Sequence, residues 1–147
     1  MPDPDNLKNL KATSDFLAQA IRDTTSIAIC CDFDVDGLTG AAQLKSFFDQ
    51  IQVKSDVYVP DRFKDGYGLN AGMLHQAKKD GHQILICVDY GTTNIKELGL
   101  AKELGFQSIV IDHHHAAEVP PADFFINPEQ VGCGFARKEI GRASCRE

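Results

Sequence analysis

The sequence lacks the features that direct a protein into a membrane or an oxidising compartment. No apolar run approaches the roughly eighteen residues of a membrane-spanning helix. The start, Met1-Pro2-Asp3-Pro4-Asp5, is acidic rather than basic, and it is not followed by the apolar stretch of a secretory signal. None of the five cysteines forms a Cys-x-x-Cys pair, and three of them lie in or beside apolar runs, where cysteine acts as a small hydrophobe. These absences predict a cytoplasmic protein with no membrane contact.

The chain also lacks an excess of positive charge. It carries 15 Lys and Arg against 21 Asp and Glu, a formal net charge of −6. This balance argues against a broad basic surface for nucleic acid. Bound cations would reverse the local field if part of the acid served as metal ligand. With 147 residues, 43% of them hydrophobic, the chain suits one globular domain with a substantial core.

The most concentrated chemistry lies in Cys31-Asp32-Phe33-Asp34-Val35-Asp36-Gly37, directly after an apolar run. In an extended backbone, residues i, i+2 and i+4 point the same way, so Asp32, Asp34 and Asp36 are expected to converge. Three carboxylates that close repel one another and tend to take up protons unless a cation compensates them. Ligands that are all oxygen favour Mg²⁺, Ca²⁺ or Mn²⁺. The run therefore predicts a metal site at the carboxyl end of a strand.

Apolar runs and helical periodicities alternate along the chain. Helices are predicted over about residues 6–23, 39–51, 70–80 and 94–104, and strands over 26–31, 53–59, 84–88 and 107–111. Thr39 and Asn70 are candidate N-caps of the second and third helices. Strands that alternate with helices of ten to fifteen residues predict an α/β fold, a parallel sheet with helices on both faces.

Two further polar clusters follow predicted strands. Asp89 comes directly after the third strand, and Asp112-His113-His114-His115 comes directly after the fourth. Ligands of parallel sheets bind beyond the carboxyl ends of the strands, so both clusters are expected on the same rim as the first aspartates. Charged residues at buried strand ends rarely serve packing, because burying them without partners is costly. A solvated histidine run is the alternative for the last cluster.

Two other protein classes share parts of the aspartate pattern. D-x-D-x-D-G also opens an EF-hand loop, but the twelfth position from Asp32 is Gln43, where a bidentate Glu is needed, and a strand rather than a helix precedes it. A strand followed by Asp-Phe-Asp also occurs in haloacid-dehalogenase-type phosphatases. That class needs no Asp-His-His, and Asp36 stands where it has Thr or Val. Both classes fit the sequence less well than a metal site built from several clusters.

Other polar residues have structural as well as functional interpretations. The loop around Gly66 and Gly68 either cradles a phosphate through backbone N–H groups or is a plain turn. Arg62 is either an anion contact or a surface charge. His75 and His82 are assigned to a helix surface and to the loop before a strand.

The polar clusters together carry a family resemblance over about residues 6–138. Asp32-Phe33-Asp34-Val35-Asp36-Gly37, Val88-Asp89-Tyr90-Gly91 and Asp112-His113-His114 resemble, in order, the first three motifs of the DHH phosphoesterase superfamily. Two other stretches, Val59-Pro60-Asp61-Arg62-Phe63 leading to Gly66-Tyr67-Gly68-Leu69 and Ile126-Asn127-Pro128, are similar to its RecJ-type single-strand-specific DNA exonucleases in particular.

The resemblance implies a role for each matching residue. It implies two divalent ions, Mn²⁺ or Mg²⁺, held by Asp32, Asp34, Asp36, Asp89 and His113, with Asp89 bridging the two ions. It places His114 toward the phosphate and implies that Asp112 orients His113. It places Arg62 and Tyr67 beside the path of the nucleic acid. The implied chemistry is in-line attack of a metal-activated hydroxide on a phosphodiester.

The chain also departs from the family pattern. The family has a fourth metal-binding Asp and a second, substrate-gripping domain, and this sequence offers no candidate for either. Residues 1–138 are therefore interpreted as an incomplete DHH domain. Residues 139–147, Glu-Ile-Gly-Arg-Ala-Ser-Cys-Arg-Glu, fit no element of the fold and read like one frame of a sequencing adapter.

The resemblance predicts the N-terminal catalytic part of a 5′→3′ exonuclease that acts on single-stranded DNA in recombination and repair, with the fragment inactive alone. Two other functions remain open. One is a DHH phosphodiesterase of short oligonucleotides or cyclic dinucleotides, and the other is a non-catalytic replication scaffold with the DHH fold. The oligomeric state is not predicted by the sequence.

Overall fold

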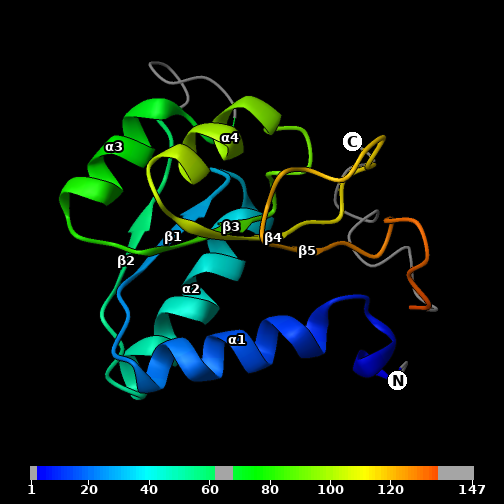
Figure 1. Cartoon of the computed structure of the whole chain (residues 1–147), viewed down its shortest axis with the longest axis horizontal. Coiled ribbons are helices and arrows are strands. Elements are labelled where there is room, and N and C mark those ends of the chain that lie inside the picture. Colours follow the sequence, from blue (N-terminus) through cyan, green and yellow to red (C-terminus); the bar gives the residue numbers. More distant parts are fainter. Residues whose placement is uncertain (1–2, 62–67, 136–147) are drawn as a thin grey trace.

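A parallel sheet lies at the centre of the protein, whose computed structural model describes residues 3–61 and 68–135 (Figure 1). The sheet has five strands in the order β2-β1-β3-β4-β5. The strands are β1 (Ile27–Cys31), β2 (Ser55–Tyr58), β3 (Ile84–Val88), β4 (Gln107–Ile111) and β5 (Phe124–Ile126). The helices are η1 (Pro4–Asn6), α1 (Leu10–Arg22), α2 (Val35–Gln50), α3 (Ala71–Lys79) and α4 (Ile95–Glu103). The predicted α/β fold is confirmed.

Helices cover both faces of the sheet (Figure 1). On one face, Ile27 and Ile29 of β1 pack with buried residues of α1 and α2, such as Phe48. On the other face, Ala28 packs with residues of α3 and α4, such as Leu74. Burial on both faces explains why β1 and β3 read as continuous apolar runs rather than alternating ones. In the described part of the chain, no helix is both long and apolar enough to cross a membrane.

Helix α2 begins four residues earlier than its apolar periodicity indicates. The Asp34 side chain caps it by accepting a hydrogen bond of 3.0 Å from the Gly37 backbone N–H. The prediction that Thr39 is the N-cap is wrong. Thr39 lies within the second turn of α2, and its hydroxyl donates to the Val35 carbonyl at 2.7 Å. Asn70 does cap α3, through a 3.0 Å bond from the Met73 N–H. Strand β5 was not predicted, because its three residues are too short to give a pattern.

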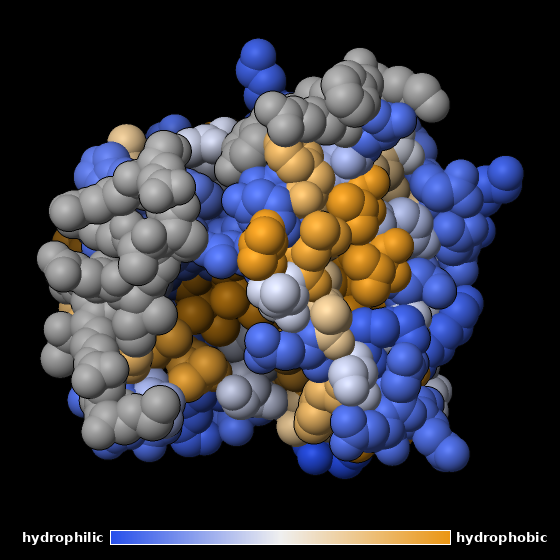
Figure 2. All heavy atoms as spheres, turned by 180° about the vertical axis from the view of Figure 1, so that it is seen from behind, coloured by the Kyte–Doolittle hydropathy of each residue, from blue (hydrophilic) through white to orange (hydrophobic). Residues whose placement is uncertain are grey.

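Strand β2 forms one edge of the sheet, and this edge has apolar side chains on its surface. Val57 and Val59 are partly exposed there, as are Leu38 of α2 and Ile51 at its end. Figure 2 shows one face of the molecule, on which apolar side chains gather into a patch bordered by hydrophilic ones. The fold thus buries its core around β1, β3 and β4 and leaves the β2 side less covered by the described residues.

Some predictions concern residues outside the described ranges. Arg62 and Tyr67, expected beside the nucleic acid, belong to residues 62–67. The tail predicted over residues 139–147 lies beyond residue 135. Both remain predictions from the sequence.

Candidate metal centre

The strand register aligns four polar residues in one row at the carboxyl edge of the sheet. Cys31, Val88, Ile111 and Ile126 are neighbours across β1, β3, β4 and β5. The residue that follows each of them is Asp32, Asp89, Asp112 or Asn127. The three aspartates also remain tied to the sheet, because their backbone N–H groups donate to the last carbonyl of the neighbouring strand at 2.9–3.3 Å. Parallel pairing thus brings together residues that lie as much as 95 positions apart, Asp32 and Asn127 (127 − 32).

The first aspartate motif turns into a helix instead of continuing as a strand. Val35 is already the first residue of α2, so Asp36 lies in the first helical turn. The expectation that the three carboxylates converge through an extended backbone is therefore wrong. Ligand atoms of Asp32, Asp34 and Asp89 do lie within 4.8 Å of one another. Among the groups that the described residues form, Asp36 belongs to none, and its ligand role remains a prediction from the resemblance.

Asp89 occupies an unusual backbone conformation and an unfavourable electrostatic position. Its φ angle of 64° lies in the left-handed region, which Asp tolerates better than most residues that carry a Cβ. Its side chain is largely buried, with 7% of the residue exposed. Burial raises the pKa of Asp89 to about 6, and the nearby Asp34 carboxylate adds to this increase, while His113 opposes it. Such strain and charge crowding at one residue are typical of functional sites.

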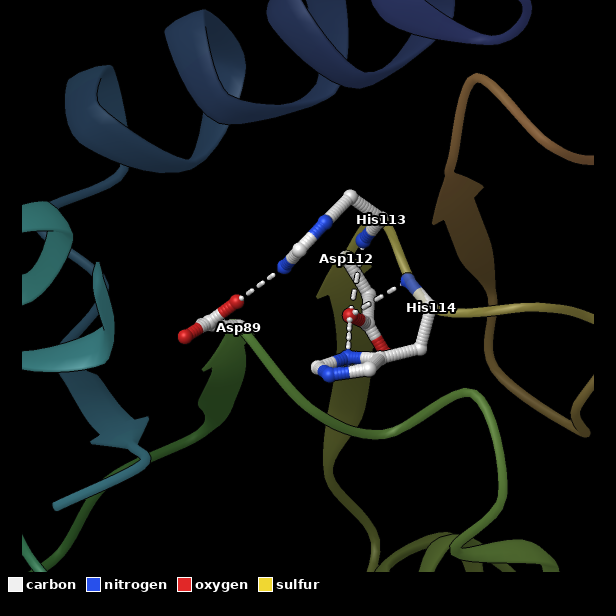
Figure 3. A group of neighbouring side chains, drawn as sticks. All are labelled: Asp89, Asp112, His113 and His114. Carbon is white, nitrogen blue, oxygen red and sulfur yellow. Dashed lines mark hydrogen bonds and ion pairs between the residues drawn. The ribbon is translucent and has the colours of Figure 1, made fainter. Parts of the chain in front are cut away.

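The two histidines of the Asp112-His113-His114 motif use different carboxylates (Figure 3). The His113 ring points to Asp89, with its Nε2 atom 2.9 Å from Asp89 Oδ1. The His114 ring lies against Asp112, with Nδ1 2.7 Å from Asp112 Oδ1. Asp112 reaches His113 through its backbone N–H, which donates to Oδ1 at 2.7 Å. The ring that Asp112 orients in this structure is therefore that of His114, whereas the resemblance had implied His113.

Asp112 and His114 shift each other's pKa in the directions that favour their charged forms. Burial alone would raise the pKa of Asp112, but hydrogen bonds from Thr92 and His114 outweigh it and lower the pKa below its ordinary value. Burial would likewise lower the pKa of His114, but the hydrogen bond to Asp112 and the negative charges of Asp112 and Asp89 together outweigh burial and raise the pKa. Because an ionised carboxylate only accepts hydrogen bonds, Nδ1 of His114 carries a proton. The Nε2 edge of that ring faces away from Asp112.

The ligand atoms at this rim fit divalent cations. Two groups of side chains have their donor atoms within 4.8 Å of one another, one made of Asp32, Asp34 and Asp89, and the other of Asp89, Asp112, His113 and His114. Asp89 belongs to both groups. Carboxylate oxygens suit Mn²⁺ and Mg²⁺, and imidazole nitrogens suit transition metals rather than Mg²⁺. Burial and the neighbouring Asp34 carboxylate raise the pKa of Asp89, and a bound cation would offset both effects.

Sequence reasoning gave no role at the site to two buried residues next to the motifs. The Thr92 backbone N–H donates to Asp112 Oδ2 at 3.1 Å, and its hydroxyl accepts a 3.2 Å bond from the Asn127 side chain. The Ile126-Asn127-Pro128 stretch was noticed only as part of the resemblance. No local pattern marks either residue, because their partners lie 20 and 35 positions away.

Comparison with known proteins matches the chain to one family. The family described as "DHH family, N-terminal domain" matches residues 26–146. The single-stranded-DNA-specific exonuclease RecJ of Bacillus subtilis (strain 168) is 36% identical over 139 residues, which cover 94% of this chain and 18% of that protein. The chain thus spans about a fifth of the length of this relative.

Two solved structures agree with this match. The crystal structure of an exonuclease RecJ bound to manganese has a TM-score of 0.77 and 29% identity, covering 90% of this chain and 36% of that one. The crystal structure of RecJ in complex with Mn²⁺ from Thermus thermophilus has a TM-score of 0.67 and 26% identity, covering 90% of this chain and 20% of that one.

Proposed function

Since this chain belongs to the DHH family, we propose that it is the metal-binding part of a RecJ-like nuclease that hydrolyses phosphodiester bonds of single-stranded DNA. The observation that carries the proposal is the position of Asp89, which lies in both groups of ligand atoms. Two relatives of similar fold are manganese-bound RecJ exonucleases. The finer proposal is 5′→3′ digestion in DNA repair and recombination in the cytoplasm.

The proposed metal ligands surround Asp89. They are Asp32, Asp34, Asp36, Asp89 and His113, which would hold two ions, Mn²⁺ or Mg²⁺. Asp89 is the proposed bridge between these ions. Such a role would explain why a carboxylate is placed where its ionisation is otherwise costly. Arg62 and Tyr67 are proposed to lie along the path of the nucleic acid.

His114 and Asp112 are the proposed catalytic pair. Bound divalent ions would supply Lewis-acid activation of the attacking water and stabilise the developing charge on the phosphate. The His114 ring is held by Asp112 through Nδ1, and its raised pKa favours the protonated ring, which has a cationic Nε2–H edge. Such a charged donor would bind a phosphate oxygen and stabilise its negative charge during the reaction. Asp112 keeps the ring oriented and protonated.

Manganese binding by the 147-residue chain tests the proposal. Isothermal titration calorimetry is expected to show Mn²⁺ binding to the unmodified chain and at least about a 100-fold loss of affinity in Asp89→Asn. Asn is the suitable replacement because it tolerates the left-handed backbone of this position. Asp15→Asn is the matched control, since it removes the same charge from an exposed pair with Lys11 on α1. Equal Mn²⁺ affinity in Asp89→Asn and Asp15→Asn would refute the site.

Activity is tested on the complete gene product, because this chain spans only 18% of its Bacillus subtilis relative. The expected result is Mn²⁺-dependent release of mononucleotides from 5′-ended single-stranded DNA, with His113→Ala inactive. Little or no activity is expected from the 147-residue chain alone. Preference for short oligonucleotides or cyclic dinucleotides over long single strands would favour the phosphodiesterase alternative. Absence of Mn²⁺ binding together with absence of hydrolysis would favour the scaffold.

A further inference from the structure

Asn127 is the only one of the four residues in the carboxyl-edge row that carries no acid group, and it is fully buried at 0% exposure. Its place after β5 puts it one strand away from Asp112. A buried amide can make several hydrogen bonds, and leaving them unmade is costly. The partners of this side chain therefore show what it holds in place.

The Asn127 side chain joins three segments of the rim. Its Nδ2 group donates to the His114 backbone carbonyl at 2.8 Å and to the Thr92 hydroxyl at 3.2 Å. Its Oδ1 atom accepts from the Glu129 backbone N–H at 2.7 Å. The amide thereby ties the loop after β5 to the turn after β3 and to the histidine loop after β4.

Both donor contacts lead to the Asp112–His114 pair. Thr92, held through its hydroxyl, donates its own N–H to Asp112 Oδ2. His114, held through its carbonyl, places its ring nitrogen Nδ1 against Asp112 Oδ1. One side chain thus fixes the carboxylate from one side and the histidine backbone from the other, although its own atoms are not among the grouped ligand atoms.

We propose that Asn127 is a positioning residue that sets the orientation of His114 and, through the same loop, of the neighbouring His113 for metal and phosphate binding. The metal part of this inference rests on the proposed function. The orientation of the His114 ring does not, because it is a property of the metal-free chain.

Four variants of the chain test the proposal. Asn127→Ala removes the whole link, and Thr92→Val removes only the hydroxyl that Asn127 contacts while keeping the shape of the side chain. Thr92→Ser restores the hydroxyl and is the conservative rescue. Gln130→Ala is the matched control, because Gln130 is also a buried amide of the loop after β5, but its Nε2 donates to the Phe125 carbonyl at 3.0 Å instead of to the rim.

Two measurements are made on each variant. Nitrogen-15 NMR of the histidine rings in the metal-free chain reports whether His114 keeps its proton on a hydrogen-bonded Nδ1. Calorimetry with MnCl₂ reports metal affinity. We expect Asn127→Ala and Thr92→Val to lose the hydrogen-bonded Nδ1–H signal of His114 and to weaken Mn²⁺ binding by about 10-fold. Thr92→Ser and Gln130→Ala are expected to retain both properties.

Retention of the His114 signal and the Mn²⁺ affinity in Asn127→Ala would overturn the proposal, and so would an equal loss in Gln130→Ala, which would indicate general packing of the loop. If Asn127→Ala does not fold, the contrast between Thr92→Val and Thr92→Ser decides alone. If the unmodified chain does not bind Mn²⁺, the proposed function fails, while the His114 signal still tests the positioning role.

Discussion

The two ends of the sheet both hold histidine beside aspartate, but they differ in burial and in how their charges are balanced. At the amino end, His82 is 1% exposed, with Nδ1 2.7 Å from the Ser26 hydroxyl and Nε2 3.1 Å from Asp56 Oδ2. At the carboxyl end, three aspartates of one row face His113 and His114. Burial favours the neutral ring of His82 in the first arrangement, whereas the second brings several carboxylates together.

A buried histidine–carboxylate pair is therefore not by itself a sign of function. The sequence assigned His82 to the loop before β3, where it does lie, but its burial comes from neighbours on β2, including the Tyr58 ring, whose centroid is 5.8 Å away. Its partners Ser26 and Asp56 lie at the starts of β1 and β2, and His82 itself lies just before β3. Asp89, by contrast, has a raised pKa and a left-handed backbone, both of which cost free energy that packing alone does not explain.

The largest expected effect comes from Gly37, which lies between the aspartate motif and the body of α2. A Cβ atom there would lie 2.6–2.9 Å from backbone atoms of Asp32, so the turn would have to open. We expect Gly37→Ala to lower the free energy of unfolding by roughly 2–4 kcal/mol and to weaken Mn²⁺ binding. Urea denaturation and calorimetry measure the two effects.

Gly99 of α4 provides the matched control for this substitution. A Cβ there would meet nothing within 4 Å, so Gly99→Ala is expected to raise the free energy of unfolding by up to about 1 kcal/mol and to leave Mn²⁺ binding unchanged. If both alanine variants are equally stable, the close approach of Gly37 to Asp32 does not exist in solution.

A smaller effect, of opposite sign, is expected for Asp89→Asn in the absence of metal. The folded chain holds the pKa of Asp89 at about 6, above the ordinary value near 4, so the folded state binds more protons and loses stability as the pH rises from about 4 to 6. Replacing the carboxylate by an amide removes that loss. We expect the variant to be more stable than the unmodified chain by on the order of 1 kcal/mol at pH 8 and not at pH 4.

Urea denaturation in the presence of EDTA at both pH values measures this difference. Together with the expected loss of Mn²⁺ affinity, a gain in stability would show that Asp89 serves binding at a cost to the fold. A loss of stability at pH 8 would show that the carboxylate is structural, and the contrast between the two ends of the sheet would disappear.

The smallest effect is the pH dependence of the amino end. Burial lowers the pKa of His82, and Lys54 acts in the same direction, while Asp56 and Asp80 oppose it. Because the unfolded chain takes up the proton more readily, the contribution of neutral His82 is present above its ordinary pKa of about 6.5 and is lost as the pH falls through the lowered folded value. Ser26 and Tyr58 also face the ring.

His82→Gln tests this prediction because glutamine keeps hydrogen-bonding capacity without titrating. The decrease in unfolding free energy between pH 7.5 and 5.5 is expected to be shallower in the variant, while Mn²⁺ affinity at pH 7.5 stays within about 2-fold of the unmodified chain. A marked change in Mn²⁺ affinity would show that the two ends of the sheet are coupled.

Much of the fold was predictable because it depends on local patterns. Apolar runs predicted strands over residues 26–31 and 84–88, and both strands are present and buried along their whole length. Short strand β5 was missed, since three residues carry too little periodicity. The predicted start of α2 was also wrong. The Asp34 side chain caps the helix, so the residues that follow it are helical and not extended.

Hydrophobic period and chain order were enough to predict the parallel α/β class and the position of polar motifs at strand ends. How those motifs meet became visible only in the folded chain. The fold places Asp89 between two groups of ligand atoms, pairs Asp112 with the ring of His114, and puts Asn127 in the same row. These arrangements depend on strand register and on turn conformations, which are set by contacts between segments far apart in the chain.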